Sequence, residues 1–268
     1  MDLVAIRQAA EAIAIRAGDT ILDHLNQPHQ EMTKTSVFDV VTEGDTAAEQ
    51  VIVAGLRELT PDVAIVTEES GLLSASAQGQ GEAHGLQWHV DPIDGTTNFA
   101  IGLPFFCVSL ALADHTLQPL IGVIYDPVAR ELFSAARGLG ATLNGSPIHV
   151  TMTETLERAV VSTGFSYNRH ITPDNNLAQW EAMLMRVRGL RRLGSAALEL
   201  AYVAAGRLDA FWEKYIQSWD CLAGLLLVAE AGGRISDYSG GSERLYSGEQ
   251  VVASNGRLHD ALLEVLNA

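Results

Sequence analysis

Basic residues are scarce in this chain. Among its 268 residues, 17 are Lys or Arg and 33 are Asp or Glu, which gives a formal net charge of -16. This balance opposes non-specific binding to nucleic acid and to anionic membranes, because their surfaces carry the same sign. We therefore expect no nucleic-acid partner. An anionic substrate would need bound cations at its site.

Cysteines and long apolar runs are also few. The two cysteines, Cys107 and Cys221, lie in apolar stretches without a C-x-x-C pattern, which predicts two buried thiols. Residues 1–3 lack the basic and apolar regions of a signal peptide. The longest apolar runs, 101–113 and 222–229, are too short to span a bilayer. We expect a cytoplasmic protein with no membrane partner.

The spacing of apolar residues and of turn residues predicts an α/β chain. Apolar residues recur at helical spacing over 3–25, and Asp45 is predicted to cap a second helix that runs to Pro61. Asn144-Gly145 predicts a hairpin turn. Strands are predicted at 63–67, 88–91, 106–112, 120–125, 131–135, 141–143, 148–150, 158–162, 208–213 and 251–253, and further helices at 173–187, 194–205, 220–231 and 258–266.

The chain is predicted to form two halves, 1–146 and 147–268, packed as one compact unit. No break in composition resembles a linker, and the alternation of strands and helices in the second half is typical of an α/β unit with crossover helices. A site is expected between the halves. Residues 72–85, rich in Ser, Ala, Gln and Gly, predict a passive surface loop rather than a lid. The eight histidines show no ligand spacing and are predicted to be surface or structural residues.

The most informative stretch is 91–98, which reads Asp-Pro-Ile-Asp-Gly-Thr-Thr-Asn. Asp91 and Asp94 follow a short apolar run, and Gly95 allows close approach of the backbone to a ligand. Thr96 suits the start of a helix, whose free N–H groups attract anions. Clustered carboxylate oxygens favour a hard cation such as Mg²⁺, which is commonly paired with phosphate. This stretch predicts metal-assisted chemistry on a phosphate ester.

Three further acidic residues precede or follow apolar segments. Taken alone, a plain helix cap explains Asp45 as well as a functional role does, and it explains Asp220 better. Glu68, alone, is typical of a solvated charge at the end of a strand. Together with Asp91 and Asp94, these side chains could share one crevice only if divalent metals offset their repulsion.

The acidic segments occur in a recognisable order and spacing. They are Lys34…Asp39…Thr42…Asp45, Glu68-Glu69-Ser70, residues 91–99 and Trp219-Asp220 followed by Glu230-Ala231-Gly232-Gly233. Over nearly its whole length the chain resembles the inositol monophosphatase family. Two positions depart from the commonest family pattern: Thr67 stands where Gly is frequent, and Ser195 stands where Thr is frequent.

The resemblance implies two or three Mg²⁺ ions between the halves. A first ion would be held by Glu68, Asp91 and the carbonyl of Ile93, a second by Asp91, Asp94 and Asp220, and a third, weaker ion would contact Glu68. The implied catalytic residues are Glu68, Thr96 and Asp45, with Thr96 orienting the attacking water. The implied substrate contacts are Asp94, Gly95, Thr96, Gly194, Ser195, Ala196, Glu213 and Asp220. The first half would carry most of the ligands, and the second Asp220 and the substrate pocket.

The resemblance also implies a fold and a reaction. The fold would be the αβαβα sandwich of the sugar phosphatases. The enzyme would be a phosphoric monoester hydrolase, a lithium-sensitive homodimer that hydrolyses inositol monophosphate to myo-inositol and phosphate by a metal-activated water. Two alternatives stay open. The substrate could be another small ester, such as fructose 1,6-bisphosphate, histidinol phosphate or adenosine 3′,5′-bisphosphate, or a protein-binding regulatory role could accompany catalysis.

Overall fold

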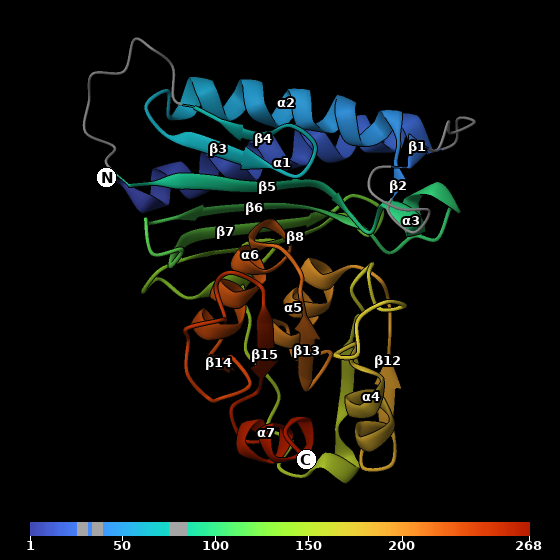
Figure 1. Cartoon of the computed structure of the whole chain (residues 1–268). Coiled ribbons are helices and arrows are strands. Elements are labelled where there is room, and N and C mark those ends of the chain that lie inside the picture. Colours follow the sequence, from blue (N-terminus) through green and yellow to red (C-terminus); the bar gives the residue numbers. More distant parts are fainter. Residues whose placement is uncertain (26–31, 34–39, 75–84) are drawn as a thin grey trace.

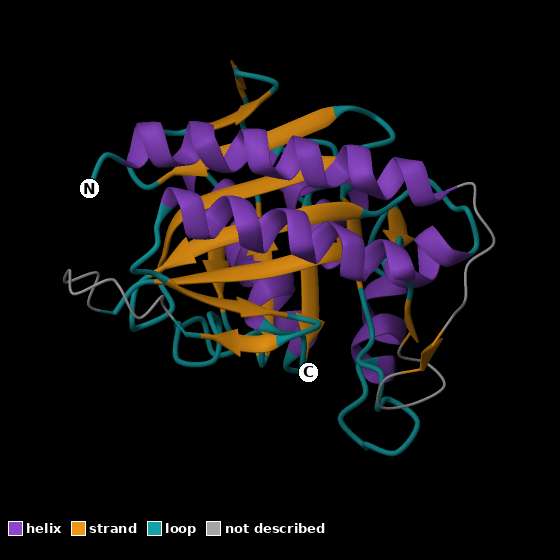
Figure 2. Cartoon of the chain, turned by 90° about the horizontal axis from the view of Figure 1, so that it is seen from above, coloured by secondary structure: helices purple, strands orange, loops and turns teal. Residues whose placement is uncertain are grey.

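The chain folds into five layers. The computed structural model describes residues 1–25, 32–33, 40–74 and 85–268. In this part of the chain the layers follow the order helices, sheet, helices, sheet, helices (Figure 1). α1 (Leu3–Leu25) and α2 (Glu43–Leu59) lie side by side over the outer face of the first sheet, as the view from above shows (Figure 2). The predicted αβαβα sandwich is confirmed.

The first sheet has eight strands in the order β10-β9-β8-β7-β6-β5-β3-β4. β3 and β5 run parallel, and the other neighbouring pairs are antiparallel. Its strands are β3 (Ala64–Thr67), β4 (Gly71–Leu73), β5 (Gln87–Asp94), β6 (Cys107–Ala113), β7 (Pro119–Asp126), β8 (Glu131–Ala136), β9 (Ala141–Leu143) and β10 (Ser146–Pro147). A separate short pair joins β1 (Met32–Thr33) to β2 (Val40–Val41).

The second sheet has five strands in the order β12-β11-β13-β15-β14. Its strands are β11 (Val160–Thr163), β12 (Gly189–Arg191), β13 (Ala210–Lys214), β14 (Arg234–Ser236) and β15 (Gln250–Ser254). α5 (Ala196–Ala204) and α6 (Ser218–Glu230) lie between the two sheets, and α4 (Leu177–Leu184) and α7 (His259–Leu266) cover the far side (Figure 1). The short α3 (Thr96–Ala100) follows β5, and a 3₁₀ turn, η1 (Leu156–Arg158), precedes β11.

Three apolar cores hold the layers together, and β6 contributes to two of them. Its alternate side chains pack beneath α1 and α2 on one face and against α5 and α6 on the other. Because both faces are covered, the strand reads as a continuous apolar run in the sequence. Cys107 lies in the central core, and Cys221 of α6 is buried there too, so both predicted buried thiols are confirmed. The residues of β6 are Val108, Leu110 and Leu112 on the outer face and Cys107, Ser109, Ala111 and Ala113 on the inner face.

The helix starts differ from the prediction in two places. α2 begins at Glu43 and its N-cap is Thr42, so the prediction that Asp45 is the cap residue was wrong. Asp45 occupies the third helical position, where its carboxylate accepts a hydrogen bond from the Thr42 N–H (2.8 Å) in a capping box. Asp220 stands at the same position of α6, whose N-cap is Gln217. An acidic side chain suits both positions, so composition alone does not separate them.

Several loops and short strands also differ. Residues 148–150 form no strand; β9 pairs instead with Ser146–Pro147, across the predicted turn at Asn144-Gly145. Leu72 and Leu73 of the predicted 72–85 loop belong to β4, and residues 75–84 lie outside the described ranges. β12 and β14 have three residues each and carry too little periodicity to be predicted. Within the described ranges, none of the helices is long and apolar enough to cross a membrane.

Among the described residues, two histidines are buried, His259 and His89. His259, at the start of α7, lies between two strands of the second sheet: its Nε2 is 2.8 Å from Oγ of Ser236, and its Nδ1 is 2.9 Å from Oγ of Ser254. Burial, with a smaller contribution from Arg234, lowers the pKa of His259 to about 4. The second, His89, lies on β5. The neutral imidazole of His259 thus connects α7 to the second sheet.

His259 makes the stability of the fold depend on pH. Its folded-state pKa lies below its unfolded value, so its contribution is complete above about pH 6.5 and is lost as the pH falls toward 4. We expect this group to cost about 2 kcal/mol of unfolding free energy at pH 5 relative to pH 7. Urea denaturation of the wild type and of His259→Gln at both pH values measures it. An equal loss in both proteins would contradict the assignment.

Candidate active site

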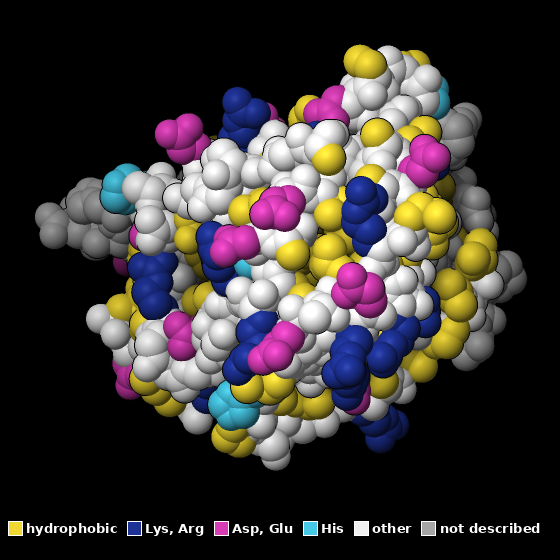
Figure 3. Space-filling view, turned by 90° about the horizontal axis from the view of Figure 1, so that it is seen from below, with side chains coloured by type: hydrophobic (Ala, Val, Ile, Leu, Met, Phe, Trp, Pro, Cys, Tyr) yellow, Lys and Arg dark blue, Asp and Glu magenta, His cyan; other side chains and the backbone are white. Residues whose placement is uncertain are grey.

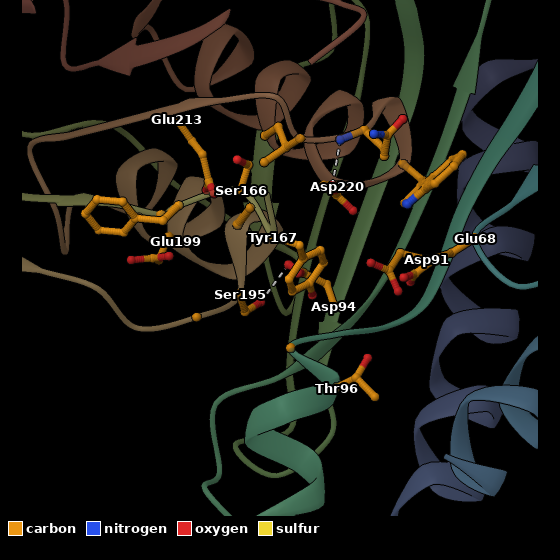
Figure 4. Close-up of a pocket in the computed structure, with 18 of the residues that line it drawn as sticks. Glu68, Asp91, Asp94, Thr96, Ser166, Tyr167, Ser195, Glu199, Glu213 and Asp220 are labelled. Carbon is orange, nitrogen blue, oxygen red and sulfur yellow. Dashed lines mark hydrogen bonds between the residues drawn. The ribbon is translucent and has the colours of Figure 1, made fainter. Parts of the chain in front are cut away.

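A cavity of about 410 Å³ opens where the two sheets and the central helices meet. Its wall carries four carboxylates that come from distant parts of the chain, and they face the same space (Figure 4). Three helices, α3, α5 and α6, begin at this cavity. The carboxylates are those of Glu68, Asp91, Asp94 and Asp220.

A β-bulge explains how one strand supplies two of these carboxylates. Asp91 pairs with Ser109 of β6 and Asp94 pairs with Cys107, so three steps on β5 match two steps on β6. In a regular strand, residues three apart point to opposite faces. The extra residue of the bulge re-aims the strand end, and Asp91 and Asp94 reach one cavity. β3 runs parallel to β5 and brings Glu68 to the same edge, where its N–H donates to the carbonyl of Val90 (3.1 Å).

The turn after β5 ties the bulge to α3 and α2. The Ile93 N–H donates to Oδ1 of Asp91 (2.9 Å). The Thr96 hydroxyl lies 3.0 Å from the carbonyl of Ile93 and 3.1 Å from Oδ1 of Asp45 and donates its proton to one of them. Gly95 has a φ of 102°, and a Cβ there would lie 3.0 Å from a backbone carbonyl, so only glycine fits. Asp45 therefore contacts the cavity through Thr96.

Asp94 is held by the start of α5. Its Oδ2 accepts hydrogen bonds from the Ser195 hydroxyl (2.7 Å) and from the Ala197 N–H (2.6 Å). Burial raises the pKa of Asp94 to about 6, although these two hydrogen bonds act in the opposite direction. Asp220 is held in a similar way by α6, because the Gln217 N–H donates to its Oδ2 (2.7 Å).

The four carboxylates repel one another. Burial, followed by the charges of its neighbours, raises the pKa of Asp91 well above its usual value, and the pKa of Asp220 is raised for the same reasons. The neighbours of Asp91 that contribute are Glu68, Asp94 and Asp220. The cluster is therefore unstable in its fully ionised form unless positive charge joins it.

The donor set fits a hard divalent cation. Among the residues that the structure describes, no group of three or more His, Cys, Asp or Glu side chains is already arranged to hold a metal ion. However, Asp91, Asp94 and Asp220 each have one oxygen fixed by a hydrogen bond from the chain, and each carries a second oxygen. Mg²⁺ prefers such oxygen ligands.

The opposite end of the cavity carries a second pair of acids. Glu213, on β13, is 6% exposed, and burial together with the charge of Glu199 raises its pKa well above its usual value. Burial also raises the pKa of Glu199 to about 8, against a hydrogen bond from the Leu193 N–H (3.1 Å). A Cβ at Gly164 would overlap the carboxylate of Glu213, so glycine leaves room for it. Glu213 points into the cavity (Figure 4).

Sequence reasoning assigned no site role to ten of the residues that line the cavity, among them Glu199, Tyr167 and Arg192. Glu199 lies one helical turn after Ser195, and that spacing could have placed it on the same face of α5. Tyr167, 49% exposed, lies beside the four carboxylates, and partial burial together with their charges raises its pKa (Figure 4). Nothing local in the sequence singles out Tyr167 or Arg192.

The structure brings the predicted site residues together, while their roles stay predictions. Of the predicted site residues, Asp45 is the one that does not line the cavity; it lies behind Thr96. Lys34 and Asp39, from the first acidic segment, lie outside the described ranges. The predicted residues that line the cavity are Glu68, Asp91, Ile93, Asp94, Gly95, Thr96, Gly194, Ser195, Ala196, Glu213 and Asp220.

Known proteins are similar to this chain in sequence and in fold. The model of the inositol monophosphatase family matches residues 2–268. An inositol-1-monophosphatase of Synechocystis sp. is 42% identical over 260 residues, which cover 97% of this chain and 88% of that protein. A Nus factor SuhB of Pseudomonas aeruginosa is 46% identical over 230 residues, or 85% and 83% of the two chains. The inositol monophosphatase structure from Anabaena (Nostoc) sp. PCC 7120 has a TM-score of 0.87 at 39% identity and covers 100% of this chain and 97% of its own.

The layered fold, the acidic cavity and these relatives define a phosphatase, an enzyme that hydrolyses phosphoric monoesters. The match extends over nearly every residue and over the motifs that form the cavity. The chain belongs to the inositol monophosphatase family.

The repulsion within the cluster predicts opposite effects of one substitution with and without metal. In EDTA, Asp220→Asn should be more stable than the wild type by about 1 kcal/mol, or roughly 2–4 °C in Tm, because a buried like charge is removed. With excess Mg²⁺, the wild type should gain stability and the variant should not. Thermal melts measure both. Glu264→Gln, an exposed carboxylate on α7, is the control, and a gain of equal size there would contradict the explanation.

Proposed function

We propose that the protein catalyses Mg²⁺-dependent hydrolysis of a small polyol phosphate, with inositol monophosphate as the reference substrate. One observation carries the proposal: four carboxylates meet at one end of a cavity, and a buried glutamate faces it from the other end. The first end fits a cation–phosphate pair, and the second fits the hydroxyl groups of an alcohol. The cavity volume lies in the range of small-ligand sites, roughly 300–1,000 Å³.

The cations would be held by Glu68, Asp91, Asp94, Asp220 and the carbonyl of Ile93. When bound, divalent cations neutralise the phosphoryl oxygens and lower the pKa of a water molecule. In the described part of the chain, none of the residues that line the cavity is a histidine, and the proposal assigns no role to one. Two or three ions per site is the proposed number, and lithium is proposed to inhibit by replacing a weakly held ion.

The residues of the chain would position the water and the phosphate. When Thr96 donates its own proton to Oδ1 of Asp45, the lone pairs of Thr96 Oγ1 are free to accept a hydrogen bond from the attacking water. Oδ2 of Asp45 is occupied by the N–H and hydroxyl of Thr42, which fixes the carboxylate for this role. The backbone N–H groups of Gly95 and Thr96, at the start of α3, would bind the phosphate.

The leaving alcohol would lie against Glu213. Its raised pKa allows the carboxyl group both to donate and to accept hydrogen bonds, as neighbouring hydroxyl groups require. The segment Gly194, Ser195 and Ala196 would form the floor beside it, and Asp94 and Asp220 would complete the contacts. Homodimer formation and a cytoplasmic location remain parts of the proposal.

The metal role of Asp91 gives the first test. Asp91→Asn should lower kcat for every accepted ester by at least about 10³-fold, because it weakens a ligand shared by two ions, while Tm in EDTA stays at or above the wild-type value. A panel of inositol 1-phosphate, fructose 1,6-bisphosphate, histidinol phosphate and adenosine 3′,5′-bisphosphate, assayed with Mg²⁺, identifies the substrate. Substantial turnover by the variant would refute the metal role of Asp91. Preference of the wild type for another ester would refute inositol monophosphate as the reference substrate.

The role of Glu213 gives the second test. Glu213→Gln should lower kcat/KM for inositol 1-phosphate by roughly tenfold, mainly through KM, and should change kcat/KM for a small aryl phosphate by less than about twofold. The aryl ester has no hydroxyl groups to bind at that end of the cavity. Steady-state kinetics on both substrates separate the outcomes, and equal losses would remove Glu213 from substrate recognition.

A binding role beside catalysis is a second candidate. Relatives named Nus factor SuhB match this chain as well as relatives named inositol-1-monophosphatase do. The face seen from below carries both basic and acidic side chains, and several of the basic ones lie side by side on one part of it (Figure 3). Retention of a protein on the immobilised chain at low but not at high salt would support this role.

A further inference from the structure

The first turn of α6 is attached to the first sheet by two buried polar contacts. The Ser109 hydroxyl, on β6, donates to the carbonyl of Trp219 (2.9 Å). The imidazole Nδ1 of His89, on β5, lies 2.8 Å from the hydroxyl of Ser218. Ser218 and Trp219 are the first two residues of α6 and immediately precede Asp220, so both contacts hold the turn that presents this carboxylate.

Both sheet residues are immediate neighbours of Asp91. Ser109 is its cross-strand partner, so the two side chains share one face of the sheet. His89 precedes Asp91 by two residues, and alternate residues of a strand face the same way. The pair of strands that carries Asp91 therefore also holds the turn that carries Asp220, although the two acids are far apart in sequence.

Apolar packing alone would not fix this geometry. α6 is almost entirely apolar, and hydrophobic contacts have no preferred direction. Gly122 lets the helix approach β7 closely, because a Cβ there would lie 2.6 Å from the carbonyl of Ala223. That contact sets the distance between α6 and β7. The hydrogen bonds from Ser109 and His89 fix where its first turn lies along the sheet, because hydrogen bonds are directional.

Burial of the His89 imidazole at this position costs free energy of folding. His89 is 3% exposed, and its Nε2 has no hydrogen-bond partner among the described residues. A buried polar atom without a partner costs free energy, and an apolar side chain would avoid that cost. An apolar side chain at this position could not form the hydrogen bond with the Ser218 hydroxyl.

We propose that His89 and Ser109 are positioning residues that set the distance between Asp91 and Asp220 and thereby the affinity of the cavity for divalent cations. The inference rests on the proposed metal-dependent function. Residues that orient metal ligands without touching the ion commonly change metal affinity by 10–100-fold when they are replaced.

Calorimetric titration of the full chain with Mg²⁺ tests the inference. Ser109→Ala and His89→Leu should each raise the Kd for Mg²⁺ by roughly tenfold or more, whereas His89→Asn, which keeps a polar atom near the Ser218 hydroxyl, should restore most of the affinity. In a double-mutant cycle, Ser218→Ala should add little to His89→Leu, because either change removes the same contact.

The matched control is Ser254→Ala. It removes a buried serine–histidine contact of the same kind, that of His259, from the second sheet. It should lower Tm in EDTA as much as the test variants do and leave the Kd for Mg²⁺ within about twofold, because it does not touch the cavity. The control separates a positioning role from a general loss of stability.

The outcomes are distinct. If Ser109→Ala and His89→Leu change the Kd no more than Ser254→Ala at an equal loss of Tm, the positioning role is refuted while the metal-dependent function stands. If the folded wild type takes up no Mg²⁺, the proposed function fails and the positioning role fails with it. If His89→Leu does not fold, Ser109→Ala and Ser218→Ala decide the question alone.

Discussion

The mutual repulsion of four carboxylates in one cavity is the constraint on which the rest of this structure depends. Asp91 and Asp94 are buried, and Glu68 and Asp220 are half-buried. Burial, together with the charges of the neighbouring acids, raises the pKa of Asp91 and of Asp220 well above the usual value. A chain that gathered them without compensation would lose stability. The fold offsets part of the repulsion itself, and the proposed cations would offset the remainder, so the repulsion would be the source of the proposed metal affinity.

The compensation comes from backbone geometry. α3, α5 and α6 all begin at the cavity, so the positive ends of three helices face the acids. The first N–H groups of α5 bind Asp94 directly, and Asp220 is fixed within its own capping box. The bulge in β5 then directs Asp91 and Asp94 to the same side. The acids and the donors that hold them thus lie at the ends of the strands and helices that meet at the cavity.

The sequence predicted the features that are encoded locally. Residues 91–98 combine carboxylates, a turn and a helix start, and the family resemblance that such segments carry implied both the layered fold and the convergence of the acids. Asp45 is not the cap residue of α2, but its carboxylate belongs to the capping box and lies 3.1 Å from the Thr96 hydroxyl, and its catalytic role stays a prediction. The contacts of Ser109 with Trp219 and of His89 with Ser218 join residues 110 and 129 positions apart. Only the packing of α6 on the sheet creates them, so no local pattern could predict them.

The central helices also affect how the molecule is made. α5 and α6 cover the inner face of the first sheet, yet they leave the ribosome after all eight strands of that sheet. Until then Ala111, Ile124 and Phe133 have no cover on that side. Exposed apolar surface of this kind makes a nascent chain prone to aggregation until the surface is covered. Folding of the sheet is therefore coupled to the synthesis of α6, and the helix that completes the core delivers the last acid of the cavity.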